Sequence, residues 1–234
     1  MVQCQPFQEV TDGDGSDVVG VRVGAVLGEN EKKEGQLSYA EFRRRVLREI
    51  TALDEERRDE SELEEETECR LAALVLANIQ FSFLGTNISN PVKLQTNNPN
   101  SSFVLYNLAR MNQILRTFEQ MVVAGQYPQL PEREKIDFNL LTEPEEWELM
   151  FNFLLSYQDV VTDCSKSLSV HKLVTFLCSL AATFSRYYNR VKILKDPLPH
   201  LIPAVHAKIC FVEEISSVVI KALALLNIGF VAKM

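Results

Sequence analysis

Apolar side chains recur every three or four positions along most of the second half of the chain. The stripe is clearest in residues 103–124, 169–194 and 203–227. A repeat of this kind matches the turn of an α-helix and leaves the opposite face polar. Helices of this type, joined by short turns, bury their stripes against one another. The pattern therefore predicts a mainly α-helical bundle of five or six amphipathic helices.

The expected core positions share this helical spacing. They are Leu108, Met111, Leu115, Phe118 and Val122 in the first segment, Leu173, Phe176, Leu177, Leu180, Phe184, Tyr187 and Val191 in the second, and Ile209, Val212, Ile215, Val219 and Leu226 in the third. Another helix is expected after Thr142, because Thr142 and Glu145 have the spacing of a capping box. Its side chains expected to face the core are Trp147, Met150, Phe151, Leu154 and Leu155.

Residues 38–84 predict two further helices around an acidic segment. The first begins with a capping box at Ser38 and Glu41, and its expected buried face consists of Tyr39, Phe42, Val46, Leu47 and Ile50. The arginines of this helix could contact nucleic acid, but the pattern favours a solvated helix face. Residues 54–68 carry ten carboxylates, which repel one another at helical spacing, so we expect a mobile or weakly helical connector. Helix is expected to resume over residues 69–84.

The remaining segments predict little regular structure. Residues 1–17 are polar and glycine-rich, which is typical of a loop. Residues 18–27 are β-branched and partly alternating, which indicates one or two short strands. Residues 87–102 are rich in Asn, Ser and Pro, and we expect a loop there with at most a short strand.

Charge is distributed unevenly along the 234 residues. The formal net charge is −8, and residues 1–102 account for all of it with 11 basic and 19 acidic side chains. Residues 103–234 hold 13 of each sign, and the stretch 166–195 contains six cations and no acid. Nucleic-acid binding needs Lys and Arg against phosphates. The second half can therefore carry a basic patch, although six cations in thirty residues can equally form a solvated face.

The residues offer no convincing catalytic or metal-binding constellation. His171, His200 and His206 lack Cys, Asp or Glu neighbours at metal-ligand spacing, so structural or surface roles are favoured. The five cysteines are scattered and form no CxxC pair, which argues against a zinc site or a disulfide framework. We therefore expect no metal or cofactor. No apolar run is long enough for a membrane span, and a reducing compartment, the cytoplasm or nucleus, fits best.

One stretch of the predicted helix segment 169–194 combines cations with aromatic rings. Arg186 and Arg190 lie four residues apart on one helix face, and Lys192 follows. Tyr187 belongs to the apolar stripe, which leaves Tyr188 free to point toward a neighbouring helix or a ligand. Rings that stack on splayed bases, next to cations that meet phosphates, suit single-stranded loops of RNA. Spacing alone favours the alternative, in which the tyrosines are core residues and the arginines only aid solubility.

A family resemblance changes this balance. The strings FVLYNLARMNQILRTFE (103–119), VHKLVTFLCSLAATFSRYYNRVKIL (170–194) and LLNIGFVAKM (225–234) resemble the DALR anticodon-binding domain of arginyl-tRNA synthetases. The string VGVRVGAVLGENEKK (19–33) is similar to the end of the synthetase catalytic core, and LAALVLANIQFSFLG (71–85) to the helix that follows. The resemblance implies a remnant of that core over residues 1–102 and an anticodon-binding helical domain over residues 103–234.

Site residues follow from the resemblance and not from spacing. It implies that Tyr106 and Arg110 face anticodon-loop nucleotides, and that Tyr188 and the terminal Met234 do the same. These join Arg186, Arg190 and Lys192 as the candidate tRNA-binding residues.

Departures from the family pattern bear on catalysis. The KMSKS loop, which would hold ATP phosphates, is shortened to the stretch 31–35 and lacks its Met-Ser pair, and the HIGH-type signature is missing. The resemblance to members of the family without synthetase chemistry implies that this protein is a non-catalytic adaptor. Such an adaptor would recognise arginine tRNAs and present them to a 3-methylcytidine tRNA methyltransferase. The alternatives are a protein-interaction module without RNA binding and a fragment of an arginyl-tRNA ligase.

Overall fold

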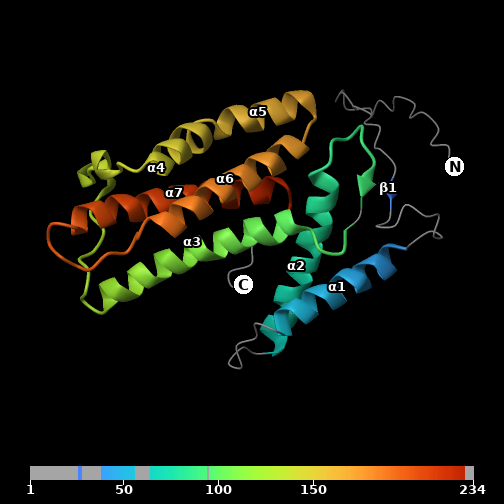
Figure 1. The fold of residues 1–234 in the computed structure, drawn as a ribbon, viewed down its shortest axis with the longest axis horizontal. Coiled ribbons are helices and arrows are strands. Elements are labelled where there is room, and N and C mark those ends of the chain that lie inside the picture. Colours follow the sequence, from blue (N-terminus) through green and yellow to red (C-terminus); the bar gives the residue numbers. More distant parts are fainter. Residues whose placement is uncertain (1–25, 28–37, 56–63, 94, 230–234) are drawn as a thin grey trace, which may run out of the picture.

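Helices make up most of the computed structural model, which describes residues 26–27, 38–55, 64–93 and 95–229 (Figure 1). The α-helices are α1 (Tyr39–Glu55), α2 (Glu64–Leu84), α3 (Pro99–Val123), α4 (Pro144–Leu149), α5 (Tyr157–Ser167), α6 (His171–Arg190) and α7 (Ile202–Leu225). The 3-10 turns η1 (Arg133–Lys135) and η2 (Phe138–Leu140) precede α4, and the π-helical segment η3 (Met150–Leu154) continues it. The predicted mainly α-helical bundle is confirmed.

Two short strands complete these elements. β1 (Val26–Leu27) and β2 (Val92–Lys93) pair in parallel, with Val26 opposite Val92. β1 falls at the end of the segment expected to form one or two strands, and β2 is the short strand allowed within the 87–102 loop. Residues 18–25 lie outside the described part of the chain.

The bundle has α6 at its centre. Figure 1 shows α4 and α5 along one side of α6 and α3 along the other, with α7 behind, and α6 contacts all four. The core positions expected in α6 are buried, as are most of those in α3 and α7. Leu115 and Val122 of α3 are only partly buried at the edge of this core. Burial of these stripes is the main stabilising contribution to the bundle.

α1 and α2 form an appendage at one end of the bundle. Phe42 and Val46 of α1 pack against Val75 and Ile79 of α2 in a small separate core. The opposite side of α2 contributes Leu74, Ala77 and Phe81 to the main core. α2 is therefore apolar on two sides because it is buried between α1 and the bundle.

The prediction for the buried face of the α4 region was wrong at three of its five positions, while Met150 and Leu154 are partly buried against the core as expected. Trp147, Phe151 and Leu155 are exposed, while Leu149 and Phe153 are buried instead. The reason is that the carboxylate of Glu146 lies inside the fold, and this sets the rotation of the helix. The Leu155 amide donates to the Met150 carbonyl five residues earlier, the π-helical bond that widens η3. The spacing of apolar residues cannot predict that a charged residue, Glu146, lies at the centre of the inward face.

The N-terminal part also departs from the prediction. Tyr39 and Leu47 of α1 are exposed, because the contact with α2 is narrower than the apolar stripe. Helix reaches into the acidic segment from both sides, since α1 extends to Glu55 and α2 begins at Glu64, five residues before the expected start at residue 69. Residues 56–63 between them lie outside the described part.

Two helix starts are displaced from the expected positions. The cap of α4 is Glu143 rather than Thr142, and the Glu143 amide donates to the Glu146 carboxylate at 2.9 Å. α3 begins at Pro99, four residues before the apolar stripe, because Asn98 caps it. The Asn98 side-chain oxygen accepts from the amides of Asn100 and Ser101, and its amide group donates to Ser82 of α2 at 3.1 Å.

Asn98→Ala is expected to lower the free energy of unfolding by about 1–2 kcal/mol, because it removes the cap of α3. It also leaves the buried Ser82 hydroxyl without this donor. Urea denaturation of both proteins measures the difference. The neighbouring Asn97 is exposed, so Asn97→Ala is the matched control and should change stability by less than about 0.5 kcal/mol. Equal effects of the two substitutions would contradict the role assigned to the cap.

Candidate nucleic-acid interface

A groove of about 870 Å³ lies between the middle of α3 and the end of α6. α3 provides Tyr106, Arg110 and Gln113, and the end of α6 provides Tyr188 and Arg190. The chain beyond α6 closes the groove with Lys192 and the two residues that follow it. The lining residues come from two parts of the chain that are far apart in sequence, α3 and the end of α6 with the residues that follow it. The packing of α3 against α6 brings them together and creates the site.

Arg110 is held between two aromatic rings within this groove. Its guanidinium carbon lies 4.6 Å from the centroid of the Tyr106 ring and 4.3 Å from that of Tyr188. The guanidinium also donates to the Tyr106 hydroxyl at 2.8 Å. Cation–π contact holds the arginine in place, and no carboxylate of the described residues forms an ion pair with it. The groove thus presents a positive charge together with two aromatic faces.

Tyr187 and Tyr188 have opposite environments, as the sequence predicted. Tyr187 is fully buried, whereas Tyr188 is 39% exposed. The Tyr187 hydroxyl donates to the Glu146 carboxylate at 2.7 Å. Burial, followed by the negative charge and hydrogen bond of Glu146, raises the pKa of Tyr187 well above its ordinary value. The inward anchoring of Tyr187 leaves the next residue directed toward α3.

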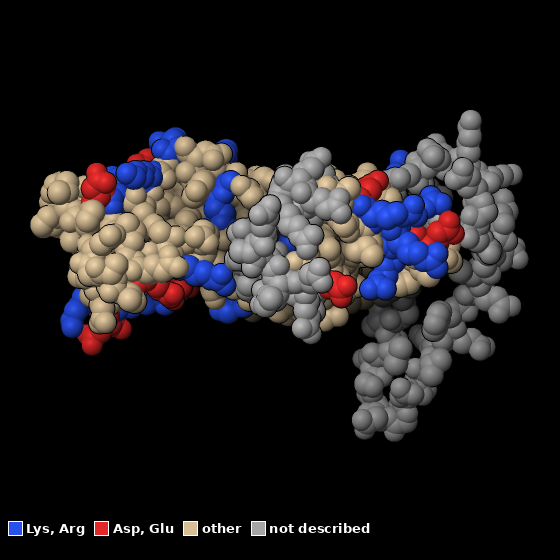
Figure 2. Space-filling view, turned by 90° about the horizontal axis from the view of Figure 1, so that it is seen from below, with Lys and Arg blue, Asp and Glu red and all other residues tan. Residues whose placement is uncertain are grey.

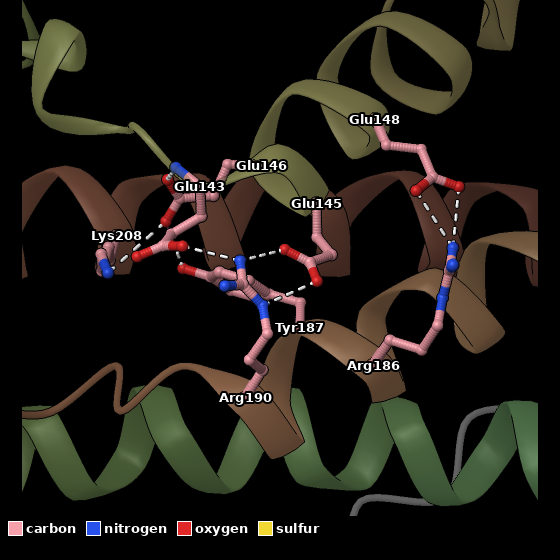
Figure 3. Close-up of polar contacts among 8 residues, drawn as sticks. All are labelled: Glu143, Glu145, Glu146, Glu148, Arg186, Tyr187, Arg190 and Lys208. Atoms are coloured by element: carbon pink, nitrogen blue, oxygen red, sulfur yellow. Dashed lines mark hydrogen bonds and ion pairs between the residues drawn. The ribbon is translucent and has the colours of Figure 1, made fainter.

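Arg186 and Arg190 extend toward the glutamates of α4 (Figure 3). Arg186 donates to both oxygens of Glu148, at 2.8 and 3.0 Å. Arg190 donates to Glu143 at 2.6 Å and to Glu145. The hydrogen bond from Arg190 lowers the pKa of the Glu145 carboxyl, and the same carboxylates raise the pKa of Arg190. Arg190 reaches the groove as a lining residue, but its charge is shared with two acids.

The carboxylates of α4 are the partners that sequence reasoning missed. Glu143, Glu145 and Glu148 lie about 40 residues before the arginines that they bind. The acid-free stretch 166–195 is consequently not free of acids in space. The run of glutamates was visible in the sequence, but spacing along the chain does not indicate which helix it will face. Gln113 and Thr117 also line the groove and were not predicted.

Glu146 connects this surface to the core. It is completely buried, and its carboxylate accepts from Tyr187 of α6 and forms an ion pair of 3.6 Å with the buried Lys208 of α7. Figure 3 shows this cluster directly behind the pairs made by Arg190. A buried carboxylate needs such partners because desolvation otherwise penalises its charge. The cluster therefore ties α4 to α6 and α7.

The last two candidate residues stand apart from these pairs. Lys192 lines the groove, and its side chain is 70% exposed with its amine 3.8 Å from Asp196. Contact at that distance with a highly exposed partner leaves the charge largely available. Met234 lies outside the described residues.

Other chemistry is sparse in the described part of the chain. His206 is buried, with its ring edge against Phe118 and a hydrogen bond to the backbone of Pro128, and burial lowers its pKa. Among the residues that the structure describes, no three His, Cys, Asp or Glu side chains are grouped as metal ligands would be. Nor does any described helix have the length and apolar character to span a membrane.

The fold and the groove can be compared with known proteins. Residues 104–234 match the family model of the DALR anticodon binding domain, which covers more than half of the chain. The protein is therefore of the helical anticodon-binding class. It belongs to the DALR anticodon-binding domain family.

Curated relatives include both synthetases and another kind of protein. The chain is 30% identical over 178 residues to the DALR anticodon-binding domain-containing protein 3 of Danio rerio. This alignment covers 68% of this chain and 32% of that protein. It is 30% identical over 132 residues to the arginine–tRNA ligase of Borreliella burgdorferi, covering 56% of this chain and 21% of the ligase. The chain thus spans about a third or less of the length of these relatives.

Solved structures show the same fold. The arginyl-tRNA synthetase of Thermus thermophilus aligns with 91% of this chain and 35% of its own, with a TM-score of 0.69 and 23% identity. The enzyme from Plasmodium falciparum aligns over the same share of this chain, with a TM-score of 0.65 and 18% identity. The alignments cover more of the chain than residues 104–234, so they include part of the region before α3.

Tyr187→Phe is expected to lower the free energy of unfolding by about 1–3 kcal/mol, because it removes a hydrogen bond to the buried Glu146 carboxylate. Thermal and urea denaturation measure the change. Tyr157→Phe is the matched control, since the Tyr157 hydroxyl has no hydrogen bond to another described residue. If both substitutions were equally mild, the Glu146 cluster would not anchor α4.

Proposed function

We propose that this protein is a non-catalytic adaptor that binds the anticodon region of arginine tRNAs in the groove between α3 and α6. The observation that carries the proposal is the arrangement of Arg110 between Tyr106 and Tyr188. An exposed ring offers a stacking surface for an unpaired base, and a guanidinium that pairs with no carboxylate in the described part of the chain offers a phosphate contact. Lys192 adds a second available charge at the rim of the groove.

The roles of the individual residues differ under this proposal. Tyr106, Arg110 and Tyr188 contact the splayed bases of the anticodon loop, and Lys192 contacts its backbone. Arg186 and Arg190 contribute mainly by holding α4 against α6, because their charges are already paired. Met234, the terminal residue, is kept as a candidate contact from the family resemblance alone.

Arginine tRNA is the proposed ligand because several relatives are named as arginine–tRNA ligases. The further step, presentation of that tRNA to a 3-methylcytidine methyltransferase, rests on the resemblance to the relatives named DALR anticodon-binding domain-containing protein 3. An adaptor of this kind would hold the anticodon loop while the partner modifies a nearby nucleotide. Such a role places the protein in the cytoplasm with its tRNA.

The protein is not expected to activate arginine. Amino-acid activation needs groups that hold ATP phosphates, and the shortened loop at residues 31–35 lacks the Met-Ser pair of the synthetase signature. ATP–pyrophosphate exchange in the presence of arginine and tRNA should therefore stay at the level of a protein-free blank. Exchange above that level would support the reading as a ligase fragment.

A protein-interaction role without RNA binding is the second candidate. The ion pairing of Arg186 and Arg190 favours it, because two of the cations expected at phosphates are neutralised by α4. Affinity purification with and without nuclease separates the two readings. A methyltransferase that stays bound after nuclease treatment contacts the protein directly, and tRNA absent from the untreated complex would remove the RNA-binding role.

Tyr188→Ala is expected to weaken the binding of arginine tRNA, because stacking on one ring contributes about 1–3 kcal/mol. The dissociation constant should rise about 5- to 150-fold at constant salt. Filter binding or fluorescence anisotropy with a labelled tRNA measures it. Tyr188 is partly exposed, so the fold should be retained.

Phe138→Ala is the control for this substitution. Phe138 is an exposed aromatic side chain of η2 that does not line the groove. Its removal should leave the affinity for tRNA unchanged. An equal loss of affinity in both variants, or no loss in Tyr188→Ala, would argue against the groove as the tRNA site.

A further inference from the structure

Arg190 lies between the groove and the glutamates of α4. It is the last residue of α6, and its side chain lines the groove. Its Nε atom donates to Glu145 at 2.8 Å, and its guanidinium also donates to Glu143 at 2.6 Å (Figure 3). Glu143 and Glu145 are here called the α4 acid pair. One cation of the groove is therefore bound by two carboxylates of the same chain.

The other arginine that lines the groove is held differently. Arg110 lies between the rings of Tyr106 and Tyr188, and no carboxylate of the described residues forms an ion pair with it. Aromatic rings attract a guanidinium group without cancelling its charge. The groove thus contains one arginine whose charge is open to an external phosphate and one whose charge is already matched. Seen from the side in Figure 2, blue and red side chains likewise lie next to each other over much of the surface.

The α4 acid pair is held in place by its neighbour Glu146. The carboxylate of Glu146 is completely buried and accepts a hydrogen bond from Tyr187, three residues before Arg190. This bond fixes α4 against the end of α6, so the two acids stay next to the arginine. Carboxylates of the same folded chain compete with an external anion at a high effective concentration.

Partial burial strengthens this pairing. The side chain of Glu145 is 17% exposed and that of Glu143 is 32% exposed, whereas the side chain of Arg190 is 49% exposed. The acids are therefore better shielded from water than the arginine, and Arg190 keeps an accessible side. The hydrogen bond from Arg190 lowers the pKa of the Glu145 carboxyl, so that this group stays charged at neutral pH. An external phosphate must share Arg190 with two negative charges or displace them.

We propose that the α4 acid pair is an autoinhibitory contact, which competes with RNA phosphate for Arg190 and lowers the affinity of the groove for RNA. The inference rests on the proposed function and adds a regulation of the same site. Phosphate contacts supply the part of RNA binding that is independent of sequence. With Arg190 neutralised, binding depends more on the rings around Arg110, which need an unpaired base, and less on the backbone that every RNA shares.

The test removes the two charges and keeps the size of the side chains, with the variant Glu143→Gln/Glu145→Gln. The RNA is a hairpin with the anticodon stem and loop of an arginine tRNA. Because Arg190 becomes available to a phosphate, we expect the dissociation constant to fall about fivefold. The slope of log affinity against log salt should become steeper by about 1. Fluorescence anisotropy at several salt concentrations measures both quantities. The expected result is a gain of binding, which a loss of folded protein would not produce.

Two further variants show whether the gain acts through Arg190. Addition of Arg190→Gln to the double variant should abolish most of the gain in affinity and of the added salt dependence. The control Glu134→Gln/Glu213→Gln removes the same charge from exposed acids that do not line the groove. It should change the dissociation constant by less than about twofold. An equal gain in this control, or a gain that survives Arg190→Gln, would reduce the effect to net charge and overturn the inference.

Two single substitutions within α4 complete the test. Glu148→Gln releases Arg186, which pairs with Glu148 at 2.8 Å but does not line the groove, so binding should not change. Glu145→Gln keeps Glu143 at the cap of α4 and should give a smaller gain than the double variant. This single variant provides the result if thermal denaturation shows that the double variant is unfolded. A gain in Glu148→Gln, or none in Glu145→Gln, would contradict the inference.

The inference and the proposed function fail in different ways. If Glu143→Gln/Glu145→Gln binds the hairpin like wild type while Tyr188→Ala weakens binding, the inference is wrong and the proposed function stands. If the double variant gains affinity through Arg190 while Tyr188→Ala has no effect, the inference stands, but the groove binds RNA through phosphates alone and the anticodon role fails. If neither wild type nor the double variant binds the hairpin, both are wrong.

Discussion

The carboxylate of Glu146 is the group on which the arrangement of the second half of the protein depends. It is fully buried, and Tyr187, Lys208 and the Glu143 amide all contact it. Removal of a carboxylate from water costs several kcal/mol unless hydrogen bonds and an opposite charge replace the solvent. These partners come from α4, α6 and α7, so the requirement to satisfy one charge determines how three helices meet. The rotation of α4, and hence the exposure of Trp147 and its neighbours, follows from it.

The same contact organises the groove. Because the Tyr187 hydroxyl is bonded to Glu146, the α6 backbone is held in a rotation that directs Tyr188 toward α3. There Tyr188 completes the aromatic pair around Arg110. The acids next to Glu146 bind Arg186 and Arg190, which removes two of the charges that a linear count assigns to RNA. The charges that remain available at the groove are Arg110, which the two rings hold, and the exposed Lys192. Position in space, and not the number of cations, decides where an anion can bind.

Much of the fold could be predicted from the sequence, because most of its helices bury apolar side chains at regular spacing. The stripe of α6 is correct at every position from Leu173 to Val191, and Tyr187 and Tyr188 were correctly separated into buried and exposed. The α4 region could not be predicted, because a charged residue occupies its inward face and a π-helical turn changes the spacing. The caps at Asn98 and Glu143 were displaced by one to four residues, since hydrogen bonds of single side chains determine where a helix starts. The arginine–glutamate pairs were missed because their partners are distant in sequence.

The sequence by itself determined the class of fold, the family and the chemical character of the groove. Periodic burial requires only local spacing, and the family pattern is carried by the residue string itself. Only the tertiary structure decided which cations are neutralised and which remain available. Ion pairs and cation–π contacts depend on distances of a few ångströms between helices, and those distances exist only after α3, α4 and α6 have packed around the buried Glu146.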